Sequence, residues 1–392
     1  MDVHVRSDSR VTRHDSVLPN PKATPRGTRP MNKTKKHNAT SSELSRWSHL
    51  PPELLDQIFA LLSPSDRHRF RLICTPWRGV AKQSIPPFPL PFEPPRLLLS
   101  RSDNALSFFD LFNSKSLSYS LPDPHRRAHC FGYLAGWFFL VSDQNPSRAC
   151  LFNPALVAEI PLPDLEFPIK KAILSAPPGF PNCVVAVMGR STSSALCELA
   201  GKRWQVLDLG HDGQRFFDDI IFWRNQLCGI VNYGIVNRLR GYVNRGNVLI
   251  CNFDMESRRS SLYTVQLPSQ WKYSEFYLVE STGGDLLAVI KNHHKFWVYK
   301  LDQWCTTWEL MEQIGDQALF LGEIRSESVP VNRFLGSGLR ENSIYLTSRK
   351  FARPFGVAVV YSMEDEAMTA VPVSGQYSVL AEPVWVSPVI WP

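Results

Sequence analysis

The chain has 392 residues, of which 44% are hydrophobic and 11% aromatic, so it can bury one large core or several smaller ones. Charged residues make up only 20%, which excludes a largely disordered chain. No apolar run approaches the roughly 18 residues of a membrane-spanning helix, so we expect no membrane span. The eight cysteines form no CxxC pair and no secretory signal is evident, which predicts reduced thiols in an intracellular protein of the nucleus and/or cytoplasm.

The net charge of +7 is concentrated at the amino terminus. Residues 1–42 contain nine basic and three acidic side chains, so the rest of the chain carries only +1. The sequence pI of about 9.0 therefore does not indicate a nucleic-acid surface on the folded body. Residues 1–43 are rich in Ser, Thr and Pro and are predicted to form a disordered basic arm. Its small cluster of Lys33, Lys35 and Lys36 is either a nuclear-import or phosphate-contacting patch or a solvated tail.

Residues 44–84 have the pattern of three short amphipathic helices. Pro51, Pro52 and Glu53 are typical of a first helical turn, where missing N–H groups and a negative charge are tolerated. Ser63–Asp66 repeats this start signal for a second helix, and Thr75–Pro76 begins a third. Apolar residues follow each start at helical spacing.

A proline-rich segment separates these helices from the remainder. Six of the ten positions from Pro86 to Pro95 are proline, which neither a helix nor a central strand accepts. Residues 85–95 are therefore predicted to form a stiff linker of polyproline character between two domains.

Residues 96–392 are predicted to be mainly β. Short apolar runs recur between turn clusters, and equivalent points lie roughly 45–55 residues apart, which suits a four-stranded propeller blade. This spacing predicts a β-propeller of about six blades. Only Gly315–Leu321 has a possible helical pattern. The last strand, Val384–Val386, has no partner nearby in sequence, so we expect it to pair with Arg96–Leu99 or Ala105–Asp110 and close the ring.

The helical region resembles an F-box, the adaptor-binding motif of substrate receptors in SCF (Skp-cullin-F-box) ubiquitin ligases. The resemblance rests on the Leu50–Leu62 segment, the Asp66 turn and the Cys74-x-x-Trp77-Arg78 ending. Arg67 departs from it, because many F-boxes have a leucine there; the change removes an apolar contact, and we expect it to shift the affinity for the adaptor rather than abolish binding. The resemblance implies binding to a Skp-type adaptor, and through it to a cullin-RING ligase, by Leu50, Pro51, Leu54, Leu55, Ile58, Leu62, Ile73 and Trp77.

The rest of the chain is similar to a plant family in which a KIB-type β-propeller follows the F-box. The similarity is carried mainly by Tyr277–Ser281, Gly284–Leu287, Phe296–Asp302 and Asn342–Thr347. It implies that the propeller captures the protein to be ubiquitinated, and that the chain is a non-catalytic receptor subunit. The sequence does not identify the target.

The sequence contains no Gly-x-Ser-x-Gly elbow, phosphate loop or dinucleotide fingerprint. His293 and His294 are adjacent, so on a strand they would face opposite ways, and we interpret them as turn or surface residues. Asp218 and Asp219 are likewise interpreted as residues of a turn. We predict no catalytic, cofactor-binding or metal-binding residues and no cofactor. Five tryptophans are interpreted as sheet-packing residues: Trp204, Trp223, Trp297, Trp304 and Trp308.

Two other functions remain open at this stage. The three helices with the basic arm resemble a helix-turn-helix DNA reader, and Arg67, Arg69 and Arg71 alternate along one predicted helix. This nucleic-acid-binding alternative is disfavoured because the charge excess of residues 44–84 is modest. Hydrolysis of a small molecule in the propeller channel is the other alternative, and no motif supports it.

Overall fold

The protein is represented by a computed structural model. The predicted basic arm, most of the linker and parts of the second and third predicted helices lie outside the residues that it describes. These are 50–61, 70, 74, 76–77, 79–80, 94–100, 105–120, 125, 128–142, 145, 147–154, 156–180, 182–207, 215–233, 247–254, 259–267, 274–334, 336–348, 358–371, 373 and 382–387.

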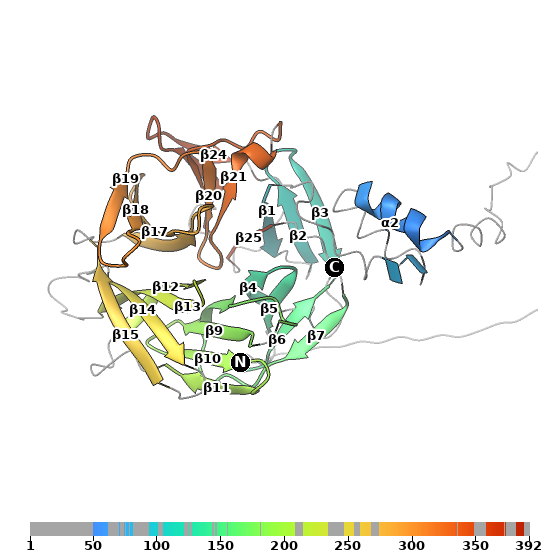
Figure 1. The fold of residues 1–392 in the computed structure, drawn as a ribbon, viewed down its shortest axis with the longest axis horizontal. Coiled ribbons are helices and arrows are strands. Elements are labelled where there is room, and N and C mark those ends of the chain that lie inside the picture. Colours follow the sequence, from blue (N-terminus) through green and yellow to red (C-terminus); the bar gives the residue numbers. More distant parts are fainter. Residues whose placement is uncertain are drawn as a thin grey trace, which may run out of the picture. The chain divides into compact units, whose positions relative to one another are not determined.

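Most of the described residues form a ring of β-sheets around a central channel (Figure 1). Five sheets have four antiparallel strands each. Sheet 1 contains β25 (Val384–Val386), β1 (Arg96–Ser100), β2 (Ala105–Asp110) and β3 (Lys115–Ser120). Sheet 2 contains β4 (His129–Leu134), β5 (Trp137–Val141), β6 (Ala149–Asn153) and β7 (Ala158–Pro161); sheet 3 contains β8 (Ile169–Leu174), β9 (Val184–Gly189), β10 (Ser194–Glu198) and β11 (Arg203–Val206). Sheet 4 contains β12 (Arg215–Trp223), β13 (Gln226–Tyr233), β14 (Asn247–Asp254) and β15 (Arg259–Gln266); sheet 5 contains β16 (Glu275–Glu280), β17 (Leu286–Asn292), β18 (Lys295–Leu301) and β19 (Trp308–Met311).

The sixth sheet departs from this pattern. It has five strands in the order β21-β20-β22-β23-β24, and β20 pairs with β22 in parallel. The predicted repeat of about six four-stranded blades therefore holds for five sheets, whereas sheet 6 has another form. Its members are β20 (Gln317–Leu321), β21 (Glu327–Pro330), β22 (Ser343–Thr347), β23 (Ala358–Ser362) and β24 (Met368–Val371), with a short 3-10 helix, η1 (Val331–Phe334), between β21 and β22.

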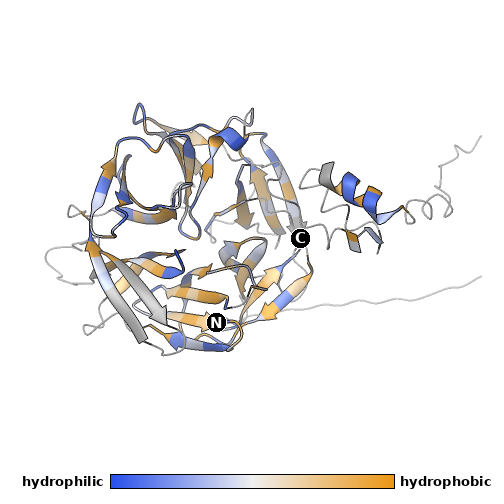
Figure 2. Cartoon of the chain, in the orientation of Figure 1, coloured by the Kyte–Doolittle hydropathy of each residue, from blue (hydrophilic) through white to orange (hydrophobic). Residues whose placement is uncertain are grey.

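Hydrophobic residues recur along the strands of the ring (Figure 2), and their side chains pack neighbouring sheets together. Successive residues of a strand point to opposite faces, so each sheet contributes to two interfaces. On β5, Phe138 and Leu140 belong to the core shared with sheet 1, whereas Phe139 and Val141 belong to the core shared with sheet 3. This double burial explains why these strands are continuous apolar runs rather than alternating ones.

The last strand closes the ring as predicted. β25 pairs antiparallel with β1, with Leu97 opposite Trp385 and Leu98 opposite Val384. Trp385 is fully buried, and its indole N–H donates to the carbonyl oxygen of Leu321 at 2.8 Å in sheet 6. Its ring also meets Phe320 edge-on, with centroids 5.0 Å apart. One side chain thus joins the last strand of sheet 1 to sheet 6.

The helical segment is described by itself. Its helix α2 spans Pro52–Leu61, and the carbonyl oxygen of Pro51 accepts hydrogen bonds from the N–H groups of Leu54 and Leu55 at 3.1 Å. Pro52 thus occupies the first helical position, as its fixed φ and missing N–H predict. This is the only α-helix whose bounds fall within the described residues, so the first of the three predicted helices is confirmed and the other two stay predictions. Among the described residues, no helix has the length and apolar character needed to cross a membrane.

One secondary-structure prediction was wrong. Gly315–Leu321, the segment with a possible helical pattern, contains strand β20. All five residues of β20 are buried, because the strand lies between two others in its sheet and packs on both faces. A short apolar run of this kind fits either a helix or a buried strand by periodicity alone.

We predict that Trp385→Ala lowers the free energy of unfolding by about 3–5 kcal/mol, because it leaves a cavity at ring closure and an unpaired carbonyl at Leu321. Trp304→Ala is the matched control, since Trp304 is 76% exposed, and it should change stability by less than about 0.5 kcal/mol. Urea unfolding of the full chain measures both values. Equal effects of the two substitutions would contradict the role of Trp385.

A second prediction concerns alkaline pH. Burial raises the pKa of Cys130 on β4 from 9.0 to about 12, and this effect outweighs a smaller lowering by the backbone of Gly132. Because the folded state keeps this thiol protonated, its contribution is complete below pH 9 and is lost as pH rises toward 12. The loss between pH 9 and pH 10 is about 1 kcal/mol. Unfolding curves of wild type and Cys130→Ala should show a shallower alkaline decline for the variant; parallel curves would refute this.

Candidate functional site

The apolar residues of the helical segment are divided between an interior and a surface. Leu55, Phe59, Phe70, Trp77 and Val80 form a buried cluster. The Phe59 and Phe70 rings meet edge-on at 5.2 Å, and the Phe70 and Trp77 rings lie 4.3 Å apart. Short helices are marginal alone, so this aromatic cluster is what stabilises the segment.

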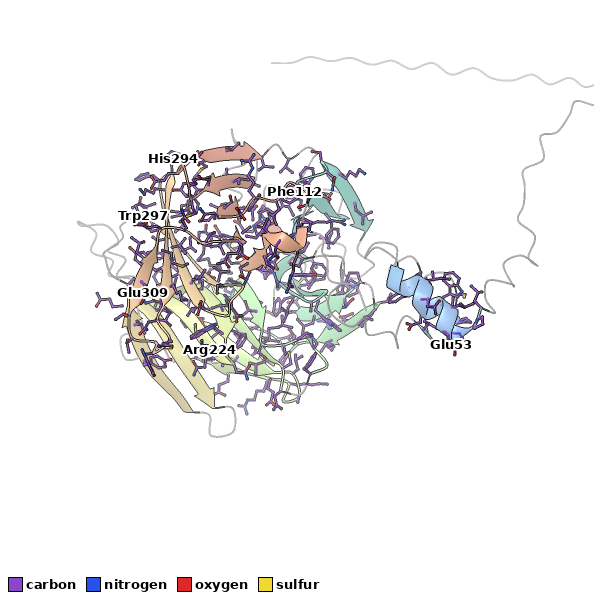
Figure 3. The ribbon with its side chains drawn as sticks, turned by 45° about the horizontal axis from the view of Figure 1, so that its top comes forward. Glu53, Phe112, Arg224, His294, Trp297 and Glu309 are labelled. Carbon is purple, nitrogen blue, oxygen red and sulfur yellow. The ribbon has the colours of Figure 1, made fainter. Side chains whose placement is uncertain are left out.

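A second row of apolar residues is accessible. Leu54 and Ile58 are four residues apart on α2 and so lie along one side of the helix. Together with Leu50, which lies just before the helix, we call them the outer stripe. Leu54 is 46% exposed, and Leu50 and Ile58 are half-buried at the edge of the cluster. Pro51 and Glu53 beside them are exposed (Figure 3). The stripe offers aliphatic surface for a partner to cover.

The structure thus sorts the predicted adaptor-binding residues into three groups. Pro51 and the outer stripe are at least partly accessible, whereas Leu55 and Trp77 are 1% and 8% exposed and belong to the interior. In this structure Leu55 and Trp77 support the segment rather than offer a surface. Leu62 and Ile73 lie outside the residues whose side chains are described, as does Arg67, whose effect stays a prediction.

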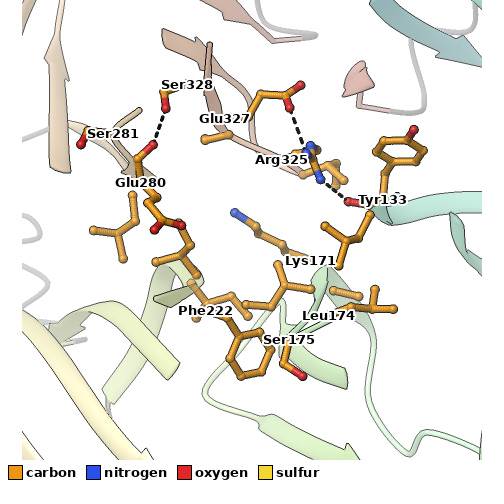
Figure 4. A pocket seen from close by; sticks show the side chains of 18 of the residues that line it. Tyr133, Lys171, Leu174, Ser175, Phe222, Glu280, Ser281, Arg325, Glu327 and Ser328 are labelled. Atoms are coloured by element: carbon orange, nitrogen blue, oxygen red, sulfur yellow. Dashed lines mark hydrogen bonds and ion pairs between the residues drawn. The ribbon is translucent and has the colours of Figure 1, made fainter. Parts of the chain in front are cut away.

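The ring has its own candidate site, a cavity of about 550 Å³ along the central channel. The cavity is lined by the inner strands β4, β8, β12, β16 and β21 and by the segment just before β21 (Figure 4). Its polar lining residues include Lys171, Glu280, Arg325, Glu327 and Arg333.

A buried ion pair crosses two sheets beside this cavity. The Nζ atom of Lys171 on β8 lies 2.5 Å from Oδ1 of Asp219 on β12, and both side chains are less than 5% exposed. The other carboxylate oxygen of Asp219 accepts the backbone N–H of Leu278 on β16 at 2.7 Å. One carboxylate therefore links three successive inner strands. The cost of burying the Asp219 carboxylate is offset by the Lys171 cation and by two backbone N–H donors, those of Leu278 and Ile220.

A second polar network lies beside the closing strand. Arg325 donates to the carbonyl oxygen of Tyr133 at 2.7 Å and to Glu327 at 2.9 Å. The hydroxyl of Tyr133 donates to the carbonyl oxygen of Ser387 at 2.7 Å, and the Ser387 hydroxyl donates to Glu327. This network joins sheets 6, 2 and 1 around the short strand β25, so these charged groups are engaged within the ring.

Sequence reasoning missed the role of Asp219. The prediction that Asp218 and Asp219 belong to a turn was wrong, because both lie within β12 at a bulge that shifts the register between Phe217 and Asp219. The bulge turns Asp219 toward its partners, and no local sequence signal marks it.

His293 and His294 are exposed in the turn between β17 and β18, as interpreted (Figure 3).

The tryptophans are mostly structural, as predicted. The indole N–H groups of Trp204 and Trp223 donate to backbone carbonyls of the neighbouring sheets, at Pro163 (2.8 Å) and Gly284 (2.9 Å). Trp308 is buried in the core between sheets 4 and 5, and Trp297 packs against it. Trp304 is the exception, being exposed.

Comparison with known families agrees with this architecture. The family model described as the KIB1-4 beta-propeller matches residues 108–369, about two thirds of the chain. The chain belongs to this family. The F-box domain model matches residues 47–88, so the chain carries an F-box before its propeller.

The relatives that the chain matches are named as F-box proteins. An F-box protein of Arabidopsis thaliana is 22% identical over 355 residues, covering 80% of this chain and 88% of the relative. A second Arabidopsis thaliana protein, provisionally named as an F-box protein, is 21% identical over 369 residues, covering 80% and 85%. The resemblance to plant F-box proteins with a KIB-type propeller is therefore confirmed. A solved luciferin-regenerating enzyme covers 74% of this chain and 80% of its own at 9% identity and a TM-score of 0.35, which supports no inference about activity.

We predict that Lys171→Met lowers the free energy of unfolding by about 3–5 kcal/mol, because it leaves the Asp219 carboxylate buried without its cation. Lys295→Met is the matched control. Its ion pair with Glu366 has a similar distance of 2.6 Å, but both side chains are about half exposed, so we expect a much smaller loss than for Lys171→Met. Chemical denaturation of the two variants measures the difference, and similar losses would show that burial does not decide the contribution.

Proposed function

We propose that this protein is a substrate-recognition subunit of an SCF ubiquitin ligase. The F-box binds a Skp-type adaptor, and through it a cullin-RING ligase, while the propeller binds the protein to be ubiquitinated. The F-box and propeller matches and the Arabidopsis relatives support this role. The nucleus and/or the cytoplasm is its proposed location.

The observation that carries the proposal is the outer stripe of the helical segment. Leu54 is 46% exposed although Leu55, the next residue, is fully buried. A small helical unit with a satisfied aromatic interior and a separate accessible aliphatic row suits docking into a partner's hydrophobic groove. Covering a leucine contributes about 1.5–3 kcal/mol before the costs of association.

We further propose that the protein is not itself a catalyst. Three charged side chains of the central cavity serve structural contacts: Lys171 pairs with Asp219, and Arg325 binds Glu327 and the carbonyl of Tyr133. Transfer of ubiquitin would then belong to the ligase partners. The DNA-reading alternative depends on Arg67, Arg69 and Arg71, which lie outside the residues whose side chains are described.

The test is co-purification of the full chain with a Skp-type adaptor. Leu54→Arg places a charge in the outer stripe and should reduce adaptor recovery at least about tenfold. Leu310→Arg is the matched control, because Leu310 is a similarly exposed leucine on β19, at 56%, and its recovery should equal wild type. Equal recovery of adaptor in all three would overturn the proposal.

Trp77 is a poor probe of docking, because its loss would also remove an aromatic contact of the interior.

Target capture is tested separately by proximity labelling with and without proteasome inhibition. Candidate targets are the proteins whose labelling by the wild-type chain rises under proteasome inhibition. The Leu54→Arg variant should still label these proteins, but the extent of labelling should no longer depend on the inhibitor. Targets lost together with the adaptor would show that the propeller does not hold them on its own.

A further inference from the structure

Sheet 2 brings together three side chains of the kinds that bind transition metals. Cys150 lies on β6, Glu159 on β7 and His125 in the segment before β4. One potential ligand atom from each lies within 4.8 Å of those of the other two. The residues are 25 and 9 positions apart without a CxxC spacing, which is why the sequence predicts no metal site.

The strand register explains how two of these residues meet. Glu159 is opposite Phe152, and Cys150 is two residues before Phe152, so Cys150 and Glu159 lie on one face as diagonal neighbours. The residue directly opposite Cys150 is Pro161. His125 is held over the same face by its ring contact with Phe152, with centroids 5.0 Å apart.

His125 lies between the other two groups. Its Nε2 lies 3.1 Å from Oε2 of Glu159, and its Nδ1 lies 3.9 Å from Sγ of Cys150. One ion can use only one of these two nitrogens. With one ligand atom taken from each residue, the three atoms lie within 4.8 Å of one another. In a tetrahedral zinc site with the usual bond lengths, neighbouring ligand atoms are about 3.4–3.6 Å apart, so the three side chains would draw together around an ion.

We propose that His125, Cys150 and Glu159 form a binding site for one Zn²⁺ ion. A thiolate, an imidazole and a carboxylate together suit zinc, whereas Mg²⁺ and Ca²⁺ require oxygen ligands. Binding forms a zinc–sulfur bond and releases the thiol proton to solvent. Water completes the coordination.

The solvent exposure of the three side chains is also compatible with a bound ion. Cys150 and His125 are 7% and 8% exposed, so they are shielded, whereas the side chain of Glu159 is 44% exposed and gives a route from solvent. An ion here would tie the segment before β4 to the outer strands of sheet 2. This site belongs to sheet 2 of the propeller and adds to the receptor function proposed above.

The full chain, stripped of metal by a chelator, is titrated with Co²⁺ as a spectroscopic probe and then with Zn²⁺. We expect one Co²⁺ per chain with a thiolate-to-cobalt charge-transfer band, which Zn²⁺ displaces. Cys150→Ser should abolish the band, and Glu159→Gln should weaken Co²⁺ binding at least about tenfold. Cys130→Ser, which removes another buried thiol of sheet 2, should bind as wild type.

Absence of the band in wild type, or its retention in Cys150→Ser, overturns the proposal. Should Cys150→Ser fail to fold, as judged by circular dichroism, Glu159→Gln decides, because its half-exposed side chain makes it the milder change. Unchanged Co²⁺ affinity in folded Glu159→Gln would then refute a three-residue site. A Zn²⁺-dependent rise of the melting temperature in wild type, lost in Glu159→Gln, is the second supporting readout.

Discussion

Closure of the ring by β25 is the constraint on which the rest of the propeller depends. Every sheet is apolar on both faces, so an open ring would expose two large apolar surfaces to water. Val384 and Val386 enter the core between sheets 1 and 2, while Trp385 between them enters the core between sheets 6 and 1. Three residues thereby complete two interfaces.

A closed ring also fixes the geometry of its inner wall. The pair of Lys171 and Asp219 is tolerable only because three strands hold the cation, the carboxylate and the N–H of Leu278 in register. The hydrogen bonds of Arg325 connect neighbouring sheets at the point where β25, with three residues, is too short to connect them alone. Rigid inner strands leave recognition to the loops between them, which is the usual division of roles in such scaffolds.

The features that follow from local patterns were predictable. The helix start at Pro51 and Pro52, the repeating sheets and the pairing of the last strand with β1 all follow from turn chemistry, spacing and an otherwise unpaired edge. Asp219 was not predictable, because its bulge and its partners come from three different sheets. Nor does helical spacing alone decide that Leu55 is buried and Leu54 exposed, since that depends on where Phe70 and Trp77 pack.

The position of β25 in the order of elements has a consequence during synthesis. About 320 residues separate α2 from β25, which a ribosome adds in roughly 15–65 s at ordinary elongation rates. Throughout that interval the helical segment is already outside while the first sheet still lacks its innermost strand. The helical segment is thus complete well before the ring can close, and the two unfinished sheet faces are exposed to chaperones during that time.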